Sequence, residues 1–174
     1  MTCTVTAFCH THWIERVFER VSAEEFAALE ALSWKVRNEL AAAGLPVLAP
    51  GINSVLAGGA EVEVDDGADA AGGVFVGWQA SPRLQACASR AFGLKQLDEP
   101  VLRHSSAVRA AMLQAMAAVL SSAGFSVEDA RDEYRPQELR VLAGPPSDQP
   151  PFWSLRDDEL TLPGWQDAPA GGTD

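Results

Sequence analysis

The chain has 174 residues and a net charge of −11, because 24 Asp and Glu outnumber 13 Lys and Arg. This length favours one domain with a tail, and an apolar fraction of 47% argues against general disorder. The negative balance argues against a nucleic-acid-binding protein and against attachment to an anionic membrane, since both need clustered basic residues.

Targeting segments and cysteine content predict the cellular compartment. No stretch is apolar enough to span a membrane, and the first ten residues do not have the pattern of a secretory signal. Three cysteines are too few, and odd in number, for a disulfide framework, so we expect a reducing cytoplasm. Arg outnumbers Lys 11 to 2 and alanine is abundant, as GC-rich codons favour, so we expect a bacterial source.

The clearest helix covers residues 22–43. Ser22 and Glu25 have the spacing of a capping box, and Gly44 followed by Pro46 ends the helix. Apolar side chains recur at helical spacing between these signals: Phe26, Leu29, Leu32, Val36 and Leu40.

A β-hairpin is predicted next, with strands at residues 60–65 and 74–79. Val62 and Val64 share one face of the first strand, as do Val74, Val76 and Trp78 of the second. The opposite face of the first strand carries three carboxylates: Glu61, Glu63 and Asp65. One side of the sheet is therefore predicted to be acidic and solvated, and the first helix is predicted to cover the other side.

Two more helices are predicted at residues 81–92 and 105–123, separated by a loop that contains Pro100. Ser81 is the expected N-cap of the first, with Pro82 at its first position. Short strands follow at 125–127 and 138–142. This order predicts a single α+β domain over residues 1–143, a two-layer sandwich in which two or three helices cover an antiparallel sheet.

Residues 144–174 form a proline-rich acidic tail with 6 of the 11 prolines and a net charge of −5. The tail also contains Phe152, Trp153 and Trp165, which a plain disordered tail is expected to lack. We expect a partly ordered strap over the domain, with a mobile terminus. The alternative is a short recognition segment.

Four potential metal ligands lie near the N-terminus: Cys3, Cys9, His10 and His12. Thiolate and imidazole ligands suit zinc. Their spacing matches no known zinc motif, and the two thiols also fit as small buried groups on a strand. We therefore expect no cofactor and keep zinc as the alternative.

No catalytic motif is present in the sequence. Cys87 is in register with Leu84 and Ala91 on the second predicted helix, so we expect it in the core. His104 lies at the predicted start of the third helix, where it would cap the helix or approach a ligand. Arg135 and the acidic stretch at residues 128–133 predict local ion pairs.

The sequence therefore favours a non-catalytic, acidic protein-binding module whose partner offers a basic segment. Secretion chaperones and immunity-type proteins have this character, and the order of elements is loosely similar to that of the chaperones, an analogy of architecture only. The candidate contact residues are Trp34, Glu61, Glu63, Asp65, Phe152, Trp153 and Trp165.

Three expectations accompany this hypothesis. We expect Trp34 to pack at the rim of the core or under the tail rather than to be exposed. One alternative function is a small-ligand- or zinc-binding protein, or an enzyme, that uses the N-terminal cluster or His104. A further alternative is a homodimer in which the tail crosses to its neighbour.

Overall fold

A computed structural model describes residues 19–53, 56–68, 72–130 and 135–154 of the chain. In these residues three helices and a four-stranded antiparallel sheet form an α+β structure, as predicted. The helices are α1 (Ala23–Ala42), α2 (Pro82–Gly93) and α3 (Pro100–Ser122). The strands are β1 (Gly59–Asp65), β2 (Gly73–Gln79), β3 (Ser126–Asp129) and β4 (Leu139–Ala143).

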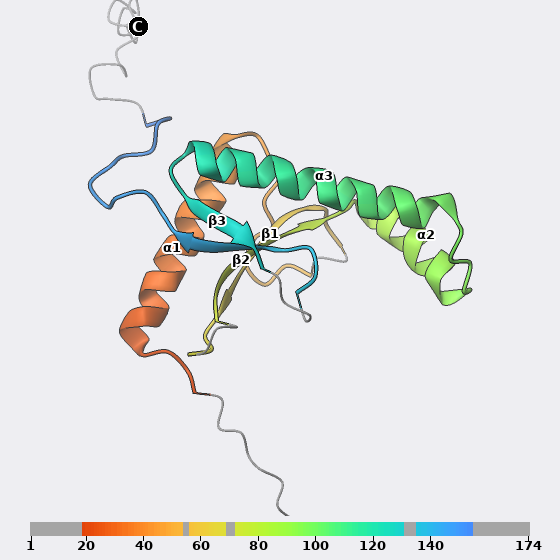
Figure 1. The fold of residues 1–174 in the computed structure, drawn as a ribbon, viewed down its shortest axis with the longest axis horizontal. Coiled ribbons are helices and arrows are strands. Elements are labelled where there is room, and N and C mark those ends of the chain that lie inside the picture. The colour runs from red at the N-terminus through yellow and green to blue at the C-terminus, as the bar shows by residue number, and fades with distance from the viewer. Residues whose placement is uncertain (1–18, 54–55, 69–71, 131–134, 155–174) are drawn as a thin grey trace, which may run out of the picture.

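The strands are arranged in the order β1-β2-β4-β3, so β1 and β3 form the two edges of the sheet. Helices α1 and α3 pack on the sheet, and both contribute to one hydrophobic core (Figure 1). This core joins side chains of both helices to side chains of β1, β2 and β4; the fully buried ones include Val36, Leu40, Met116, Leu120, Val74 and Val76. Burial of each such side chain contributes about 1.5–3 kcal/mol, so this apolar layer fixes where α1 lies beside β1.

Helix α1 begins with the predicted capping box. The Glu25 N–H donates to Ser22 Oγ over 3.2 Å, and the Ser22 N–H donates to Glu25 Oε2 over 2.8 Å. The bond from the Ser22 backbone lowers the pKa of the Glu25 carboxyl. After the helix, Gly44 adopts a φ of +82°, and this turn directs the chain towards the sheet edge.

The predicted start of α3 at residue 105 is wrong, because the helix begins at Pro100. Proline is suited to the first helical position, where its missing N–H would have no partner within the helix. The additional residues lengthen α3 beyond the sheet. Helix α2, whose N-cap is Ser81 as predicted, packs along this part of α3.

The two helices therefore form a projection, which we call the helical arm and define as residues 82–110. The arm extends away from α1 and from the sheet, as Figure 1 shows. None of the helices in the described part of the chain has the length and apolarity needed to cross a membrane.

Candidate binding surface

The outer edge of β1 is partly covered by two other segments. The Ala60 N–H donates to the Pro46 carbonyl over 2.8 Å, and the Leu48 N–H donates to the Ala60 carbonyl over 2.9 Å. At the other end of the strand, the Val21 N–H donates to the Asp66 carbonyl over 2.9 Å. Since strand backbone groups alternate in direction, Val62 and Val64 must also point their N–H and C=O groups away from β2.

The middle of this edge is accessible only at Val64, because Val62 is 3% exposed. The Arg37 side chain, from α1, donates to the Val62 carbonyl and, over 2.7 Å, to the Leu48 carbonyl. The N–H of Val62 and both backbone groups of Val64 have no hydrogen-bond partner in the described ranges. An edge strand with unpaired groups is a template for pairing with another chain.

A hollow of about 400 Å³ lies beside this stretch. We call it the edge hollow; it is lined by Glu30, Ser33, Trp34 and Arg37 of α1, by Pro50 and Gly51, and by residues 62–64 of β1. The Trp34 side chain is 55% exposed, which corrects the expectation that it packs at the rim of the core or under the tail. Trp34 is exposed because it lies beside the apolar stripe of α1, whose buried positions are Val36 and Leu40.

Charged side chains of both signs line the edge hollow. Glu30 and Glu63 line it, and Glu61 lies next to it in a smaller hollow of about 250 Å³ that shares Arg37. Burial lowers the pKa of the Arg37 guanidinium below its usual value, and the Glu61 carboxylate partly offsets this. Arg37 keeps its positive charge although it donates to two carbonyls, and Arg135 pairs with Glu63, so Glu30 is the lining carboxylate for which no ion pair is found in the described ranges.

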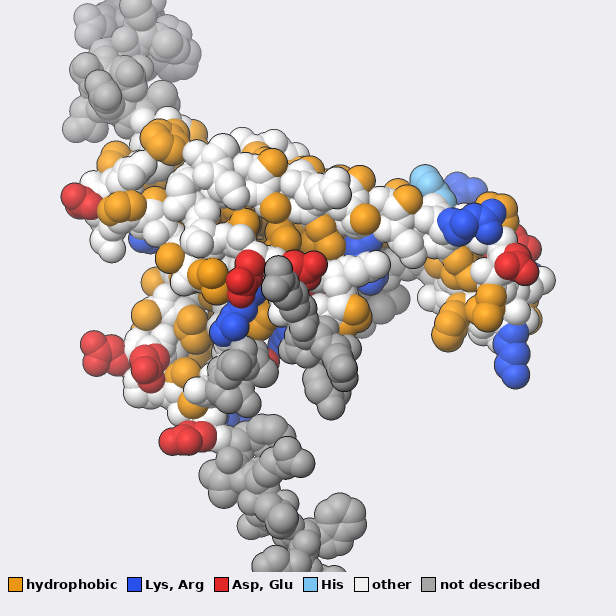
Figure 2. All heavy atoms as spheres, in the orientation of Figure 1, with side chains coloured by type: hydrophobic (Ala, Val, Ile, Leu, Met, Phe, Trp, Pro, Cys, Tyr) orange, Lys and Arg blue, Asp and Glu red, His pale blue; other side chains and the backbone are white. Residues whose placement is uncertain are grey.

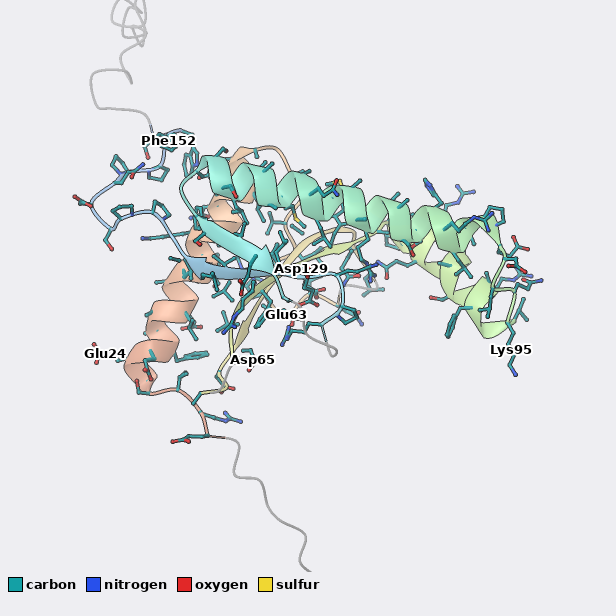
Figure 3. The ribbon with its side chains drawn as sticks, viewed as in Figure 1. Glu24, Glu63, Asp65, Lys95, Asp129 and Phe152 are labelled. Carbon is teal, nitrogen blue, oxygen red and sulfur yellow. The ribbon has the colours of Figure 1, made fainter. Side chains whose placement is uncertain are left out.

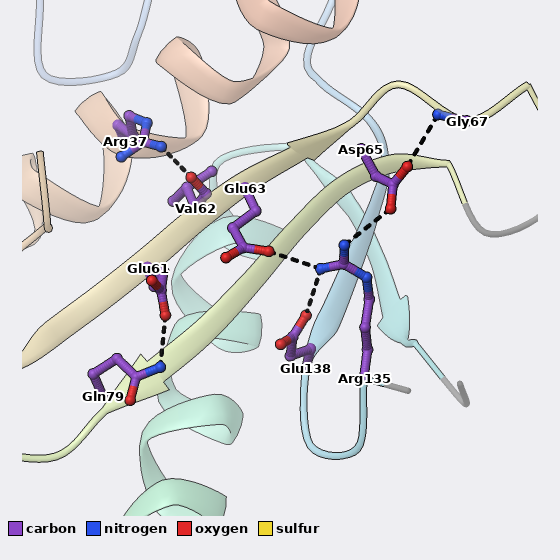
Figure 4. A network of polar contacts seen from close by, with 9 residues as sticks. All are labelled: Arg37, Glu61, Val62, Glu63, Asp65, Gly67, Gln79, Arg135 and Glu138. Atoms are coloured by element: carbon purple, nitrogen blue, oxygen red, sulfur yellow. Dashed lines mark hydrogen bonds and ion pairs between the residues drawn. The ribbon is translucent and has the colours of Figure 1, made fainter. Parts of the chain in front are cut away.

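The face of the sheet opposite the core carries a network centred on Arg135 (Figure 4). Its guanidinium forms ion pairs with Glu63 at 2.9 Å, Asp65 at 3.0 Å and Glu138 at 3.3 Å. The same guanidinium lies 4.3 Å from the ring centre of Phe75, a cation–π contact, and Phe75 is only 2% exposed. This face is therefore less solvated than the strand alternation predicts.

Arg135 makes ion pairs that the sequence does not predict, across the sheet with Glu63 and Asp65 of β1. The predicted local pairs involve residues 131–134, which lie outside the described residues. Desolvation alone would lower the pKa of Arg135, but the hydrogen bonds to its three carboxylates raise it overall. Desolvation raises the pKa of Glu138, Arg135 offsets part of this shift, and repulsion from Glu63 and Glu61 adds to it.

The first part of the tail contacts α1. The Trp153 indole N–H donates to Glu39 Oε2 over 2.8 Å, while Phe152 is 72% exposed. Residues 145–153 and the C-terminal part of α1 enclose a cavity of about 380 Å³. Trp34 does not line this cavity, so the structure places Trp34 and Trp153 at different sites.

Neither Cys87 nor His104 lies where the sequence predicts it. Cys87 is exposed, so its predicted place in the core is wrong: α2 packs on α3 through a stripe that includes the buried Ala91, and Cys87 lies beside this stripe. Because α3 starts at Pro100, His104 lies inside the helix and not at its start, so it cannot cap the helix. Its side chain is exposed.

The N-terminal cluster of Cys3, Cys9, His10 and His12 lies outside the described residues, as does Trp165. Within the described ranges, no group of three or more His, Cys, Asp and Glu side chains is arranged to hold a metal ion. The sequence candidates that the structure brings together are thus Trp34 and Glu63, which line the edge hollow, with Glu61 and Asp65 on the same strand.

Comparisons with protein-family models, curated proteins and solved structures find no match to this chain.

Proposed function

We propose that this chain is a non-catalytic module that binds a segment of another protein in the edge hollow. The observation that supports the proposal is the unpaired, partly exposed backbone of Val64 on the edge of β1, which lines the same hollow as the exposed indole of Trp34. Exposed tryptophans are enriched among the residues that contribute most to protein interfaces. Unpaired strand groups beside such an anchor can add a partner by backbone hydrogen bonds.

The chemistry of the partner segment follows from the charges of the hollow. Glu30 in the hollow and Glu61 beside it favour basic side chains, and the net charge of −11 attracts a basic segment at long range. The indole favours an apolar side chain between them. A segment that alternates basic and apolar residues would satisfy both, because an added strand presents alternate side chains to opposite faces.

The paired segment must be short. Residues 46–48 already occupy the edge at Ala60, and residue 21 occupies it at Asp66. The Val62 carbonyl accepts from Arg37 and Val62 is 3% exposed, so Val64 remains, which corresponds to pairing with about two or three partner residues. We therefore expect modest affinity for an isolated peptide.

The test is a titration of the isotope-labelled full chain with an acetylated peptide that alternates Lys and Val, followed by amide NMR. The amide signals of Val62 and Val64 and the indole signal of Trp34 should shift, and the exchange of the Val64 amide with solvent should slow. A matched peptide with Glu in place of Lys should bind about tenfold more weakly or not at all.

Two substitutions at one position separate backbone pairing from side-chain contact. Val64→Pro removes an outward N–H that the β1–β2 ladder does not use, so the fold should be retained and peptide binding should fall about tenfold. Val64→Thr keeps this N–H and should bind as the wild type does. Shifts confined to residues outside the hollow, or equal binding of the Lys and Glu peptides, would contradict the proposal.

A further inference from the structure

The end of the helical arm exposes three large hydrophobic side chains within six residues. Phe92, Leu94 and Leu97 are 69%, 59% and 64% exposed. Figure 2 shows hydrophobic and basic side chains together at this end of the molecule. Single exposed hydrophobic residues are ordinary, but a cluster of this kind marks an interaction site.

The arm is also the positively charged part of an acidic protein. Residues 82–110 contain five basic and two acidic side chains, a net charge of +3. The remaining residues therefore carry a net charge of −14, and the two parts sum to the total of −11. Three of the basic residues accompany the apolar cluster, Arg90, Lys95 and Arg103, and the two acidic residues of the arm, Asp98 and Glu99, follow Leu97 directly. Arg103 donates to the Asp98 carbonyl over 3.0 Å, which fixes it against the loop between α2 and α3. We call these three basic and three apolar residues the arm tip.

The arm tip does not reach the edge hollow of its own chain. Lys95 lies at the far end of the molecule from Phe152 and from α1 (Figure 3). Helix α3 is packed on the sheet through the buried Met116 and Leu120, and it contains no glycine or internal proline at which it could bend back. The tip of one chain therefore cannot bind the edge hollow of the same chain.

We propose that the arm tip of one copy binds the edge hollow of a second copy. This inference rests on the proposed function and names the partner. The tip combines basic and apolar side chains, and the hollow combines Glu30 with the exposed indole of Trp34. Two positively charged arms repel each other, as do the negatively charged remainders of two chains. Contact between the arm of one copy and the hollow of another is therefore the attractive arrangement.

The contact is made by side chains. The loop of the tip uses its own backbone in turns, for example from the Lys95 N–H to the Phe92 carbonyl over 2.9 Å and from the Glu99 N–H to the Gln96 carbonyl over 3.1 Å. The tip therefore does not add a strand to β1. Self-association and peptide binding both cover Trp34, so a peptide that binds the hollow competes with the second copy.

The test is sedimentation of the full chain over a range of protein concentrations. The wild type should associate, and raising the ionic strength from about 0.1 M to about 1 M should weaken association at least about tenfold, because the screening length falls from about 10 Å to about 3 Å. A tip variant, Phe92→Ser with Leu97→Ser, and a hollow variant, Trp34→Ser, should each be monomeric. All three side chains are exposed, so neither variant should unfold.

Mixing the two variants gives the sharpest result. The tip variant has an intact hollow and the hollow variant has an intact tip, so an equimolar mixture should form dimers although each alone is monomeric. Leu142→Ser removes another exposed hydrophobic side chain, 52% exposed and outside both surfaces, and should associate as the wild type does. Association of the tip variant alone, or a monomeric mixture, would overturn the proposal.

The outcomes also distinguish this inference from the proposed function. A monomeric wild type that still binds the Lys–Val peptide at Val64 would overturn self-association and leave the function intact. A monomeric wild type that binds no peptide would overturn both. If the monomer co-sediments with phosphatidylserine vesicles and the tip variant does not, the tip binds lipid and the proposal is wrong.

Discussion

Arg135 organises the outer face of the sheet at the scale of a single residue. It neutralises carboxylates from β1 and from the segment before β4, and it covers the ring of Phe75. Its side chain is only 19% exposed, so these interactions are poorly screened by solvent. The residue thereby joins β1 to β4 across β2, and it keeps the strand that borders the edge hollow in place.

Replacing Arg135 should therefore be costly. We expect Arg135→Ala to lower the free energy of unfolding by about 2–3 kcal/mol, because three carboxylates lose a charged donor and Phe75 loses its cover. Arg135→Lys should recover only part of this, since an ammonium group cannot reproduce the planar, forked geometry. Urea unfolding monitored by circular dichroism measures both changes.

The matched control is the exposed ion pair between Arg20 and Asp66, 3.1 Å apart with side chains 75% and 41% exposed. Arg20→Ala should change the free energy of unfolding by less than about 0.5 kcal/mol. Equal effects of the two alanine substitutions would show that the Arg135 network does not stabilise the fold.

Glu138 predicts a pH effect whose sign can be worked out. Its pKa in the folded protein lies above the ordinary value of 4.5, so its contribution to stability is present below pH 4.5 and is lost as the pH rises through the raised pKa. Glu138→Gln has no such titration. Urea unfolding of both proteins should show the wild type gaining stability relative to the variant between pH 7 and pH about 4. A difference that does not vary with pH would contradict the raised pKa.

At the scale of elements, helix-capping residues and strand alternation explain which parts of the fold were predictable. Ser22, Glu25 and Gly44 define α1 locally, and the alternation of Val62 and Val64 defines β1, so both were predicted within one or two residues. The start of α3 was wrong because Pro100 is compatible both with a loop and with a first helical position.

The edge hollow could be predicted only in part. Trp34 and Glu63 were candidates from the sequence, but their proximity depends on how α1 packs over β1. The roles of Arg37 and Arg135 were missed, because their partners lie 25 and 70–72 residues away in the sequence and no local spacing encodes such pairs. For Arg37, the only indication in the sequence of a role outside the core was its position beside the apolar stripe of α1.

Gly59 determines how the edge of β1 is covered. Its φ is +144°, and a Cβ there would lie 2.6 Å from the Pro46 carbonyl oxygen. Gly59→Ala should therefore lower the free energy of unfolding by about 1–3 kcal/mol and detach residues 46–48 from Ala60. Amide exchange of Leu48 and Ala60 should accelerate accordingly.

Gly93→Ala serves as the control for this prediction, because a Cβ at Gly93 meets nothing within 4 Å. It should leave the exchange of Leu48 unchanged. Unchanged exchange of Leu48 and Ala60 in Gly59→Ala would mean that the edge is covered independently of this contact.

At the scale of the whole molecule, the tail returns to its own domain at least as far as Trp153. A double-mutant cycle with Trp153→Phe and Glu39→Gln measures this contact. We expect a coupling energy of about 0.5–1 kcal/mol in urea unfolding at low protein concentration, because the Trp153 side chain is 48% exposed. A coupling that appears only at high concentration would assign the contact to a neighbouring copy.

The separation of charge between arm and body has a consequence for how the protein orients. A positive projection on a strongly negative body makes the molecule a large electric dipole. Adsorbed to a cationic surface such as an anion exchanger, the protein should be held by its body, with Phe92 and Leu97 directed into solution. In the same way, the electric field of a cationic surface in the cell would orient these molecules, with the arm directed away from the surface, before contact.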